Sequence, residues 1–278
     1  MFRLLSRFVQ LSFLGLAAFM QVIAAGAAQT IPNHIDPSAY EDTLDLSLVP
    51  AIRFLTSPDF PPFNYKDASG EVVGFNIELA EALCVVLDAD CTLQSWPWGQ
   101  MPKALEDGQG DAIVAGLMID AQNGRRFNFS QSYLQLPGRF LRLQKGAVVD
   151  EFNPHQVSSI VGARRGSSHQ AYLKQHFPNM TVLPFDSDLD VLAGVQNGIV
   201  DLAFVDGMRT SIWLNQNDCC DFVGGAYFSE EFFGAGLSVA VSREKSDMLR
   251  AINLGLRRLS NNGKLDELYL KWFPVGFY

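Results

Sequence analysis

Small polar groups at the ends of two expected strands have the types needed to hold a charged small molecule. Gly166, Ser167 and Ser168 open a helix after a strand, so backbone N–H groups and hydroxyls there could hold a carboxylate. Asp206 ends another strand, and because a buried unpaired acid is costly, we expect a cation or a strong donor to meet it. Both features have a structural alternative, since serine and aspartate also cap helices. The chemistry is that of binding, and we expect no catalytic residues and no cofactor.

The strand before Asp206 belongs to a pattern that occurs twice. The two copies are Leu105, Gly108, Asp111 and Ile113, followed by a loop at Gly116, and Val195, Gly198, Asp201 and Ala203, followed by Asp206. Each copy predicts a helix end, a glycine cap, a Gly-x-x-Asp turn and a buried strand, although a plain helix-to-strand turn would explain either copy alone. Open α/β sheets bind ligands beyond the carboxyl ends of their strands. Two such units facing each other would enclose a cleft for a small molecule.

Strand and helix patterns alternate from residue 52 onward, which predicts parallel sheets covered by helices. We expect strands at 52–57, 92–95, 112–115, 139–143, 160–163, 181–183, 202–205 and 237–241, and helices at 77–87, 167–176, 189–197, 208–215, 248–259 and in a last segment ending near residue 272. Residues 29–51 are polar and acidic without clear periodicity, which predicts a flexible or surface-lying extension. Compact structure is expected to start at Ile52.

The first 28 residues have the build of a secretory signal peptide. Arg3 and Arg7 precede an apolar run from residue 8 to residue 25 and a small-residue end at Ala28. An uncleaved anchor is the alternative, and we expect cleavage, export to the periplasm and no lipid attachment, because no cysteine lies near the cleavage point. The remaining chain has 19 basic and 30 acidic residues, a net charge of about −11, which disfavours nucleic acid and anionic membranes as partners.

The four cysteines fall into two pairs. Cys84 and Cys91 lie at the end of a helix and the start of the next strand, a spacing that suits a local disulfide in an oxidising compartment. Cys219 and Cys220 are adjacent, and a vicinal bridge, two free thiols and a contact with another chain all remain open. The four histidines show no ligand spacing with the cysteines, so we expect no metal site.

Several segments together resemble the periplasmic solute-binding proteins of polar amino-acid ABC transporters, family 3, including the histidine- and lysine/arginine/ornithine-binding proteins. The matching segments, in chain order, are 58–63, 70–71, 74–80, 111–116, 129–130, 201–206, 262–265 and 272–273. The resemblance implies a type II periplasmic-binding-protein fold: two α/β lobes joined by two hinge strands, which we place near 138–142 and 233–238. Lobe 1 would comprise 52–138 and 237–278, and lobe 2 would comprise 139–236. Ligand binding would act by hinge closure.

The resemblance also implies positions for a ligand site. Phe60 and Trp98 stand where the family has aromatic rings against the ligand, with ordinary core packing as the alternative for both. Asp206 matches the carboxylate that binds the ligand ammonium. Ser167 and Ser168 match a carboxylate-binding helix start. Gly116 opens the loop that contributes further contacts.

Four positions depart from that family pattern. Asn123 replaces the arginine that clamps the ligand carboxylate, and asparagine cannot supply a bidentate charged contact. Met118 replaces a serine or threonine, while Ser57 and Asn76 replace acids. Arg125 is an alternative carboxylate partner, as are Arg126, Arg164 and Arg165. The solute could therefore be an amine, an apolar or aromatic compound, or a modified amino acid.

Our main functional hypothesis is a non-catalytic, monomeric receptor that delivers a small polar or amino-acid-like solute to an ABC permease. Cyclohexadienyl or arogenate dehydratases look similar across the same fold, but their chemistry requires a carboxylate clamp and a general acid. A third reading is an accessory binding protein that works without a permease.

Overall fold

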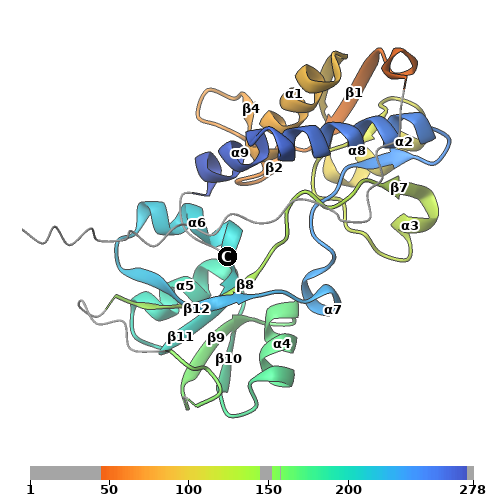
Figure 1. The fold of residues 1–278 in the computed structure, drawn as a ribbon. Coiled ribbons are helices and arrows are strands. Elements are labelled where there is room, and N and C mark those ends of the chain that lie inside the picture. Colours follow the sequence, from red (N-terminus) through yellow and green to blue (C-terminus); the bar gives the residue numbers. More distant parts are fainter. Residues whose placement is uncertain (1–44, 145–151, 157, 274–278) are drawn as a thin grey trace, which may run out of the picture.

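The computed structural model describes residues 45–144, 152–156 and 158–273, arranged as two α/β lobes joined by two chain crossings (Figure 1). The expected signal peptide, nearly all of the expected extension and the last five residues lie outside the described residues. Within the described part of the chain, no helix is both long and apolar enough to cross a bilayer.

The first lobe is built on a five-stranded sheet that uses both ends of the chain. Its strand order is β5 (Asp90–Ser95), β1 (Ala51–Thr56), β6 (Ala112–Ile113), β13 (Ala240–Ser242) and β7 (Phe127–Phe129). Alternate residues of the central strands face opposite sides, so Phe54 packs under one layer of helices and Leu55 under the other. A small second sheet, formed by β2 (Asp59–Phe60), β3 (Asn64–Lys66) and β4 (Val72–Val73), carries the loop after β1.

Helices cover both faces of the first sheet. α1 (Phe75–Leu87), α8 (Ser246–Asn261) and α9 (Lys264–Trp272) pack together on one face (Figure 1), and α2 (Met101–Glu106) packs on the other. α8 buries Met248, Ala251, Ile252, Gly255, Leu256 and Leu259, the three-to-four-residue spacing of an amphipathic helix. The other first-lobe helical elements are short: η1 (Leu46–Leu48), η2 (Trp98–Gln100) and α3 (Asn123–Arg126).

The second lobe is built from one continuous stretch of chain. Its sheet has the order β10 (Thr181–Phe185), β9 (Ile160–Arg164), β11 (Leu202–Asp206), β8 (Gly138–Leu143) and β12 (Cys220–Tyr227). α4 (Ser168–His176) packs on one face of this sheet, while α5 (Asp188–Gln196) and α6 (Gly207–Gln216) contribute to the core on the other. The short α7 (Glu230–Phe233) follows β12 and leads into the return crossing.

The two sequence repeats form the same local structure in the two lobes. Gly108 and Gly198 have φ angles of 70° and 69°, the left-handed conformation that closes a helix. In both copies the next residue's N–H donates back to the last helical turn, at 2.9 Å from Gln109 and 2.8 Å from Ile199. The Gly-x-x-Asp turn and the strand that follows are therefore confirmed twice.

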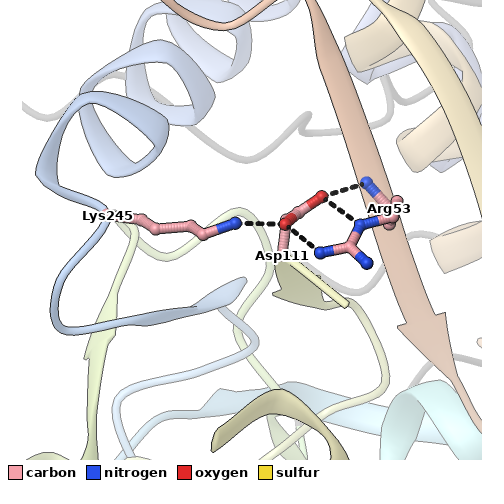
Figure 2. Close-up of polar contacts among 3 residues, drawn as sticks. All are labelled: Arg53, Asp111 and Lys245. Atoms are coloured by element: carbon pink, nitrogen blue, oxygen red, sulfur yellow. Dashed lines mark hydrogen bonds and ion pairs between the residues drawn. The ribbon is translucent and has the colours of Figure 1, made fainter. Parts of the chain in front are cut away.

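The repeat aspartates each tie their turn to the neighbouring strand. Asp201 accepts the backbone N–H of Ile160 at 2.9 Å, and Asp111 accepts that of Arg53 at 2.8 Å. Figure 2 shows that Asp111 also binds the Arg53 guanidinium, at 2.8 and 3.0 Å, and the ammonium of Lys245. Burial alone would raise the pKa of Asp111, but these hydrogen bonds outweigh it and lower the pKa to about 2. The contacts join β1, the turn before β6 and the segment before α8.

The two crossings lie side by side and are hydrogen-bonded to each other. Leu134 and Leu237 form an antiparallel bridge, and the Tyr133 N–H donates to the Leu237 carbonyl at 2.9 Å. The outward crossing therefore precedes residues 138–142. The sequence-based placement of the crossing at those residues needs correction, because they belong to β8 inside the second sheet. The expected crossing at 233–238 coincides with the return segment between α7 and β13.

Two further expectations need correction. Both sheets are mixed rather than parallel, because β13 runs antiparallel to β6 and β7, and β8 runs antiparallel to β11 and β12. The compact region also starts before Ile52, since Val49 is buried and Leu46 packs against the first-lobe core.

Both cysteine pairs are joined. The predicted disulfide between Cys84 and Cys91 links the end of α1 to β5. Cys219 and Cys220 form a vicinal bridge at the start of β12, which is one of the three states that the sequence left open.

Candidate functional site

A cavity of about 350 Å³ lies where the first lobe meets the two crossings. Its walls come from the loop after β1, from η2, from the loop after β6 and from both crossings. The side chains that line it are mainly apolar: Phe60, Trp98, Met118, Ile119, Leu136, Phe233 and Leu237. Among the described residues that line it, Asp59 is the only charged one. The cavity therefore suits a ligand whose main part is apolar or can stack on aromatic rings. The one acid in the lining favours a positively charged group on that ligand.

Phe60 and Trp98, the two rings expected at the site, both line this cavity. Phe60 lies at the end of β2 and stacks on the fully buried Phe63, with ring centroids 4.8 Å apart. Trp98 opens η2 and keeps 43% of its surface exposed. An exposed indole in a concave apolar wall is available to a ligand, whereas Phe60 is held from behind by the first-lobe core.

Gly116 and Met118 line the same cavity on the loop after β6. Gly116 has a φ of 76°, and a Cβ atom there would lie 2.8 Å from Cε1 of Phe60. Glycine is thus required both for the backbone conformation and for the close approach of the Phe60 ring. Met118 is 65% exposed, so its thioether side chain forms an apolar part of the rim.

Ser57 lies outside the cavity lining, at the end of a buried chain of polar side chains. The Tyr133 hydroxyl donates to Oδ1 of Asn76 at 2.8 Å, and Nδ2 of Asn76 donates to Oδ1 of Asn64 at 2.8 Å. Nδ2 of Asn64 in turn donates to the carbonyl and the Oγ of Ser57, at 2.8 and 3.1 Å. Ser57 and Asn76 therefore connect the loop after β1 to the outward crossing.

Asn123 and Arg125 also lie outside the cavity lining. Nδ2 of Asn123 donates to the Met118 carbonyl at 3.0 Å, and its backbone N–H donates to Oδ1 of Asp120 at 2.7 Å. The residue thus closes the loop that carries Met118. Arg125 is exposed on α3, and Arg126 is paired with Glu106 at 2.6 Å.

Ser167 and Ser168 begin α4 in the second lobe, and Ser167 acts as its N-cap. The Ser167 Oγ accepts the N–H of Gln170 at 3.1 Å and donates to the Arg164 carbonyl at 2.7 Å. The N–H of Gly166 donates to the side-chain Oε1 of Gln170 at 2.9 Å. Ser168 is exposed, and neither serine lines the cavity.

Asp206 ends β11 and caps α6. Its Oδ1 accepts the N–H of Arg209 at 3.0 Å, which is the capping role considered as the alternative to ligand binding. Burial of the carboxyl raises its pKa to about 6, because the charged form is poorly hydrated there. In the sheet Asp206 pairs with Gly138, and Gly138 follows the cavity residue Leu136 by two residues. It does not line the cavity of the first lobe, but it stands beside one crossing on the facing lobe.

No separate signal in the sequence marks Asp59, Ile119, Leu136 or Phe233 as cavity residues. Phe233 ends α7 and stacks on His169 of α4, with centroids 4.9 Å apart. Burial lowers the pKa of His169 to about 4, so the imidazole is neutral at neutral pH and packs as an aromatic ring. Only the apolar types of Ile119, Leu136 and Phe233 and the glycines at 234 and 236 could have suggested an apolar wall beside a hinge.

The arginines of the second lobe near α4 and α6 are engaged with acids. Arg164 lies 3.7 Å and Arg209 lies 3.6 Å from Asp188, and Arg165 lies 3.1 Å from Asp186. No group of three or more histidine, cysteine or acidic side chains within the described residues is placed to hold a metal ion.

Comparisons with known proteins agree with one another. Residues 52–275 match the profile of the bacterial extracellular solute-binding proteins, family 3. A protein of Escherichia coli (strain K12) named as a candidate ABC transporter arginine-binding protein 2 is 29% identical, covering 83% of this chain and 94% of its own. The histidine-binding periplasmic protein of Salmonella typhimurium is 25% identical, covering 82% and 89%. Substrate-binding domain 2 of Lactococcus lactis GlnP, crystallised in an open conformation, has the same fold, with a TM-score of 0.73 at 16% identity over 81% and 96% of the two chains.

Proposed function

Because the chain belongs to the bacterial extracellular solute-binding proteins, family 3, we propose that it is the receptor of an ABC importer and binds a small polar or amino-acid-like solute between its lobes. The relatives above are named as binding proteins, and this chain is likewise a transport receptor rather than an enzyme. Its permease partner would recognise the form in which both lobes contact the solute.

The observation that carries this proposal is the position of the cavity. Its lining includes Leu136 on the outward crossing and Phe233 and Leu237 at the two ends of the return crossing, so a change of angle between the lobes changes the shape of the cavity. The first lobe supplies the rings of Phe60 and Trp98. Hinge closure would bring Asp206, Ser167 and Ser168 of the second lobe toward them, so that one solute contacts both lobes only in the closed form.

The boundaries of the mature protein are part of the same proposal. Cleavage after residue 28 would release a periplasmic, unlipidated monomer with an N-terminal extension at 29–51. The moving units would be residues 52–138 with 237–278 and residues 139–236. The pattern of Arg3, Arg7 and the apolar run supports the cleavage, and the two separate sheets support the division into lobes.

Thermal shift and small-angle X-ray scattering, applied to the mature protein with a panel of amino acids, amines and aromatic acids, test this function. A true ligand at one hundred times its dissociation constant adds about 2.7 kcal/mol to the free energy of unfolding and should also reduce the radius of gyration. Trp98→Ala should weaken binding of that ligand, while Trp272→Phe on α9, which is not part of the cavity lining, should leave binding unchanged. A ligand that stabilises the protein without compaction and is indifferent to Trp98 would contradict closure around this cavity.

A further inference from the structure

The cavity combines aromatic faces with a single type of charge. Phe60 and Trp98 contribute aromatic residues to its lining, and Asp59 is the one charged residue among the described lining residues. Cations bind aromatic faces through the ring quadrupole, and this attraction is strongest where water is excluded. Within the described chain no lysine or arginine lines the cavity, so nothing at this wall balances a negative group on a solute.

The loop beside the cavity uses its own donors internally. Oδ1 of Asp120 accepts the backbone N–H groups of Gln122 and Asn123, at 2.8 and 2.7 Å. The amide of Asn123 holds the Met118 carbonyl, and the guanidinium of Arg126 is paired with Glu106. A carboxylate arriving here would find an aspartate already occupying the position of an anion.

The facing lobe shows the same arrangement at the start of α4. The side-chain oxygen of Gln170 accepts the N–H of Gly166, and the hydroxyl of Ser167 is used for both a cap and a bond to Arg164. Arg164 itself lies against Asp188, together with Arg209. The N–H of Gly166 and the hydroxyl of Ser167 are therefore already bonded within this lobe, and its nearby arginines face acids.

Asp206 is different, because its described partners are backbone N–H groups only. The carboxylate accepts from the backbone N–H groups of Arg209 and Met208 at the start of α6. The Arg209 guanidinium is near enough to lower its pKa, but no ion pair joins the two in the described chain. A half-buried carboxylate in this position is stabilised when a cation is brought to it. Closure would present Asp206 to a solute already held against the wall with Asp59.

We propose that the solute is an organic cation without a carboxylate group, an alkylamine or alkylguanidine, held by Asp59 and Asp206 against the Phe60 and Trp98 rings. This inference rests on the proposed receptor function. It selects one of the solute classes that the sequence left open, because Asp59 and Asp206 place an acid on each lobe, whereas no lysine or arginine of the described chain lines the cavity.

Pairs of compounds that differ only in the carboxylate test the inference. Isothermal titration calorimetry should compare agmatine with L-arginine and cadaverine with L-lysine. We expect the decarboxylated member of at least one pair to bind more than about tenfold more tightly, a difference of about 1.4 kcal/mol. Tighter binding of the amino acid in both pairs would overturn the inference but leave the receptor function standing, as would binding of only neutral or anionic members of the wider panel. Absence of binding by every compound of that panel would overturn both.

Variants locate the charge that matters. Asp59→Asn removes one acid, and Asp206→Ser removes the other while keeping an oxygen that caps α6. Each substitution should lower the affinity for the cationic solute by about tenfold or more, as expected for loss of a charged partner. Met118→Arg, which adds a cation at the exposed rim without changing the bonds of Asn123, should shift preference toward the carboxylate-bearing member of the pair. Asp90→Asn is the matched control, because Asp90 is an exposed acid at the start of β5, whereas Trp98 follows the end of that strand. This substitution should leave the affinity unchanged. Unchanged affinity in both acid variants would refute the assignment.

Discussion

Replacing Tyr133 by phenylalanine tests whether the series of buried hydrogen-bonded side chains from Tyr133 to Ser57 contributes to the stability of the protein. The substitution removes one hydroxyl and keeps the ring, which packs 6.1 Å from the ring of Phe75. Burial raises the pKa of the Tyr133 phenol far above its usual range, so the hydroxyl stays protonated and acts as the donor to Asn76. Phenylalanine leaves Oδ1 of Asn76 without that donor in a site with no exposed surface.

The size of the effect follows from this loss of a partner. A buried acceptor left unsatisfied costs about 1–3 kcal/mol, more than the net value of an ordinary hydrogen bond. For a protein of this size each kcal/mol lowers the melting temperature by about 2–4 °C. We therefore expect a decrease of the melting temperature of roughly 2–12 °C, and a lower urea midpoint without a change in slope.

Tyr65→Phe is the matched control for urea unfolding. Tyr65 lies on β3 with its ring at the edge of Trp272, and none of the hydrogen bonds described above involves its hydroxyl. Its loss should leave the urea midpoint close to that of the parent protein. Equal midpoints for Tyr133→Phe and the parent protein would show that the chain from Tyr133 to Ser57 adds nothing measurable, and the reasoning would fail.

Three other predictions concern separate parts of the molecule. The folded pKa of Asp111 lies below its unfolded value, so its stabilisation of about 2 kcal/mol is complete above about pH 5 and is lost progressively as the pH falls toward about 2. Asp111→Asn should flatten this part of the pH–stability curve measured by urea unfolding. Gly116→Ala should lower ligand affinity in calorimetry because its Cβ meets Phe60, whereas Gly198→Ala, with a similar φ and open space, should cost only about 1–2 kcal/mol of stability and leave affinity intact. Joint replacement of Cys84 and Cys91 by alanine should lower the free energy of unfolding by about 2–3 kcal/mol in the same urea assay, and an unchanged value would show that the bridge is not formed in solution.

The repeated helix-to-strand unit was predictable because its physics is local. A glycine in the left-handed conformation, an aspartate three residues later and a short apolar run lie within a few residues of one another. Both copies form as expected around Asp111 and Asp201. Strand direction was less accessible, since β8 and β13 follow crossings whose path depends on the whole fold.

Four of the residues expected at the ligand site could be placed at the cavity from local sequence patterns. Phe60, Trp98, Gly116 and Met118 line it because they occupy loops at the carboxyl ends of strands, which the alternating pattern locates. Ser57 occupies a similar loop and yet is buried. Its partner Asn64 is seven residues away on another strand, and no pattern along the chain shows that the amide of Asn64 turns inward.

The return crossing shows what a linear pattern omits. Leu136 and Phe233 are nearly one hundred residues apart but face one cavity, since the crossings pair through Leu134 and Leu237. Asn123 likewise has a role that only coordinates show, because the amide that stands in place of an arginine holds the Met118 carbonyl.

The position of β13 between β6 and β7 determines the order in which the lobes can be completed. All five strands of the second sheet lie within residues 138–227, so that lobe has its full set before residue 240 has been translated. Until then the first sheet lacks β13, so the backbone edges of β6 and β7 that pair with this strand remain unpaired. A chain shortened before residue 240 would therefore display two open strand edges, the kind of surface that promotes aggregation, next to a finished companion lobe.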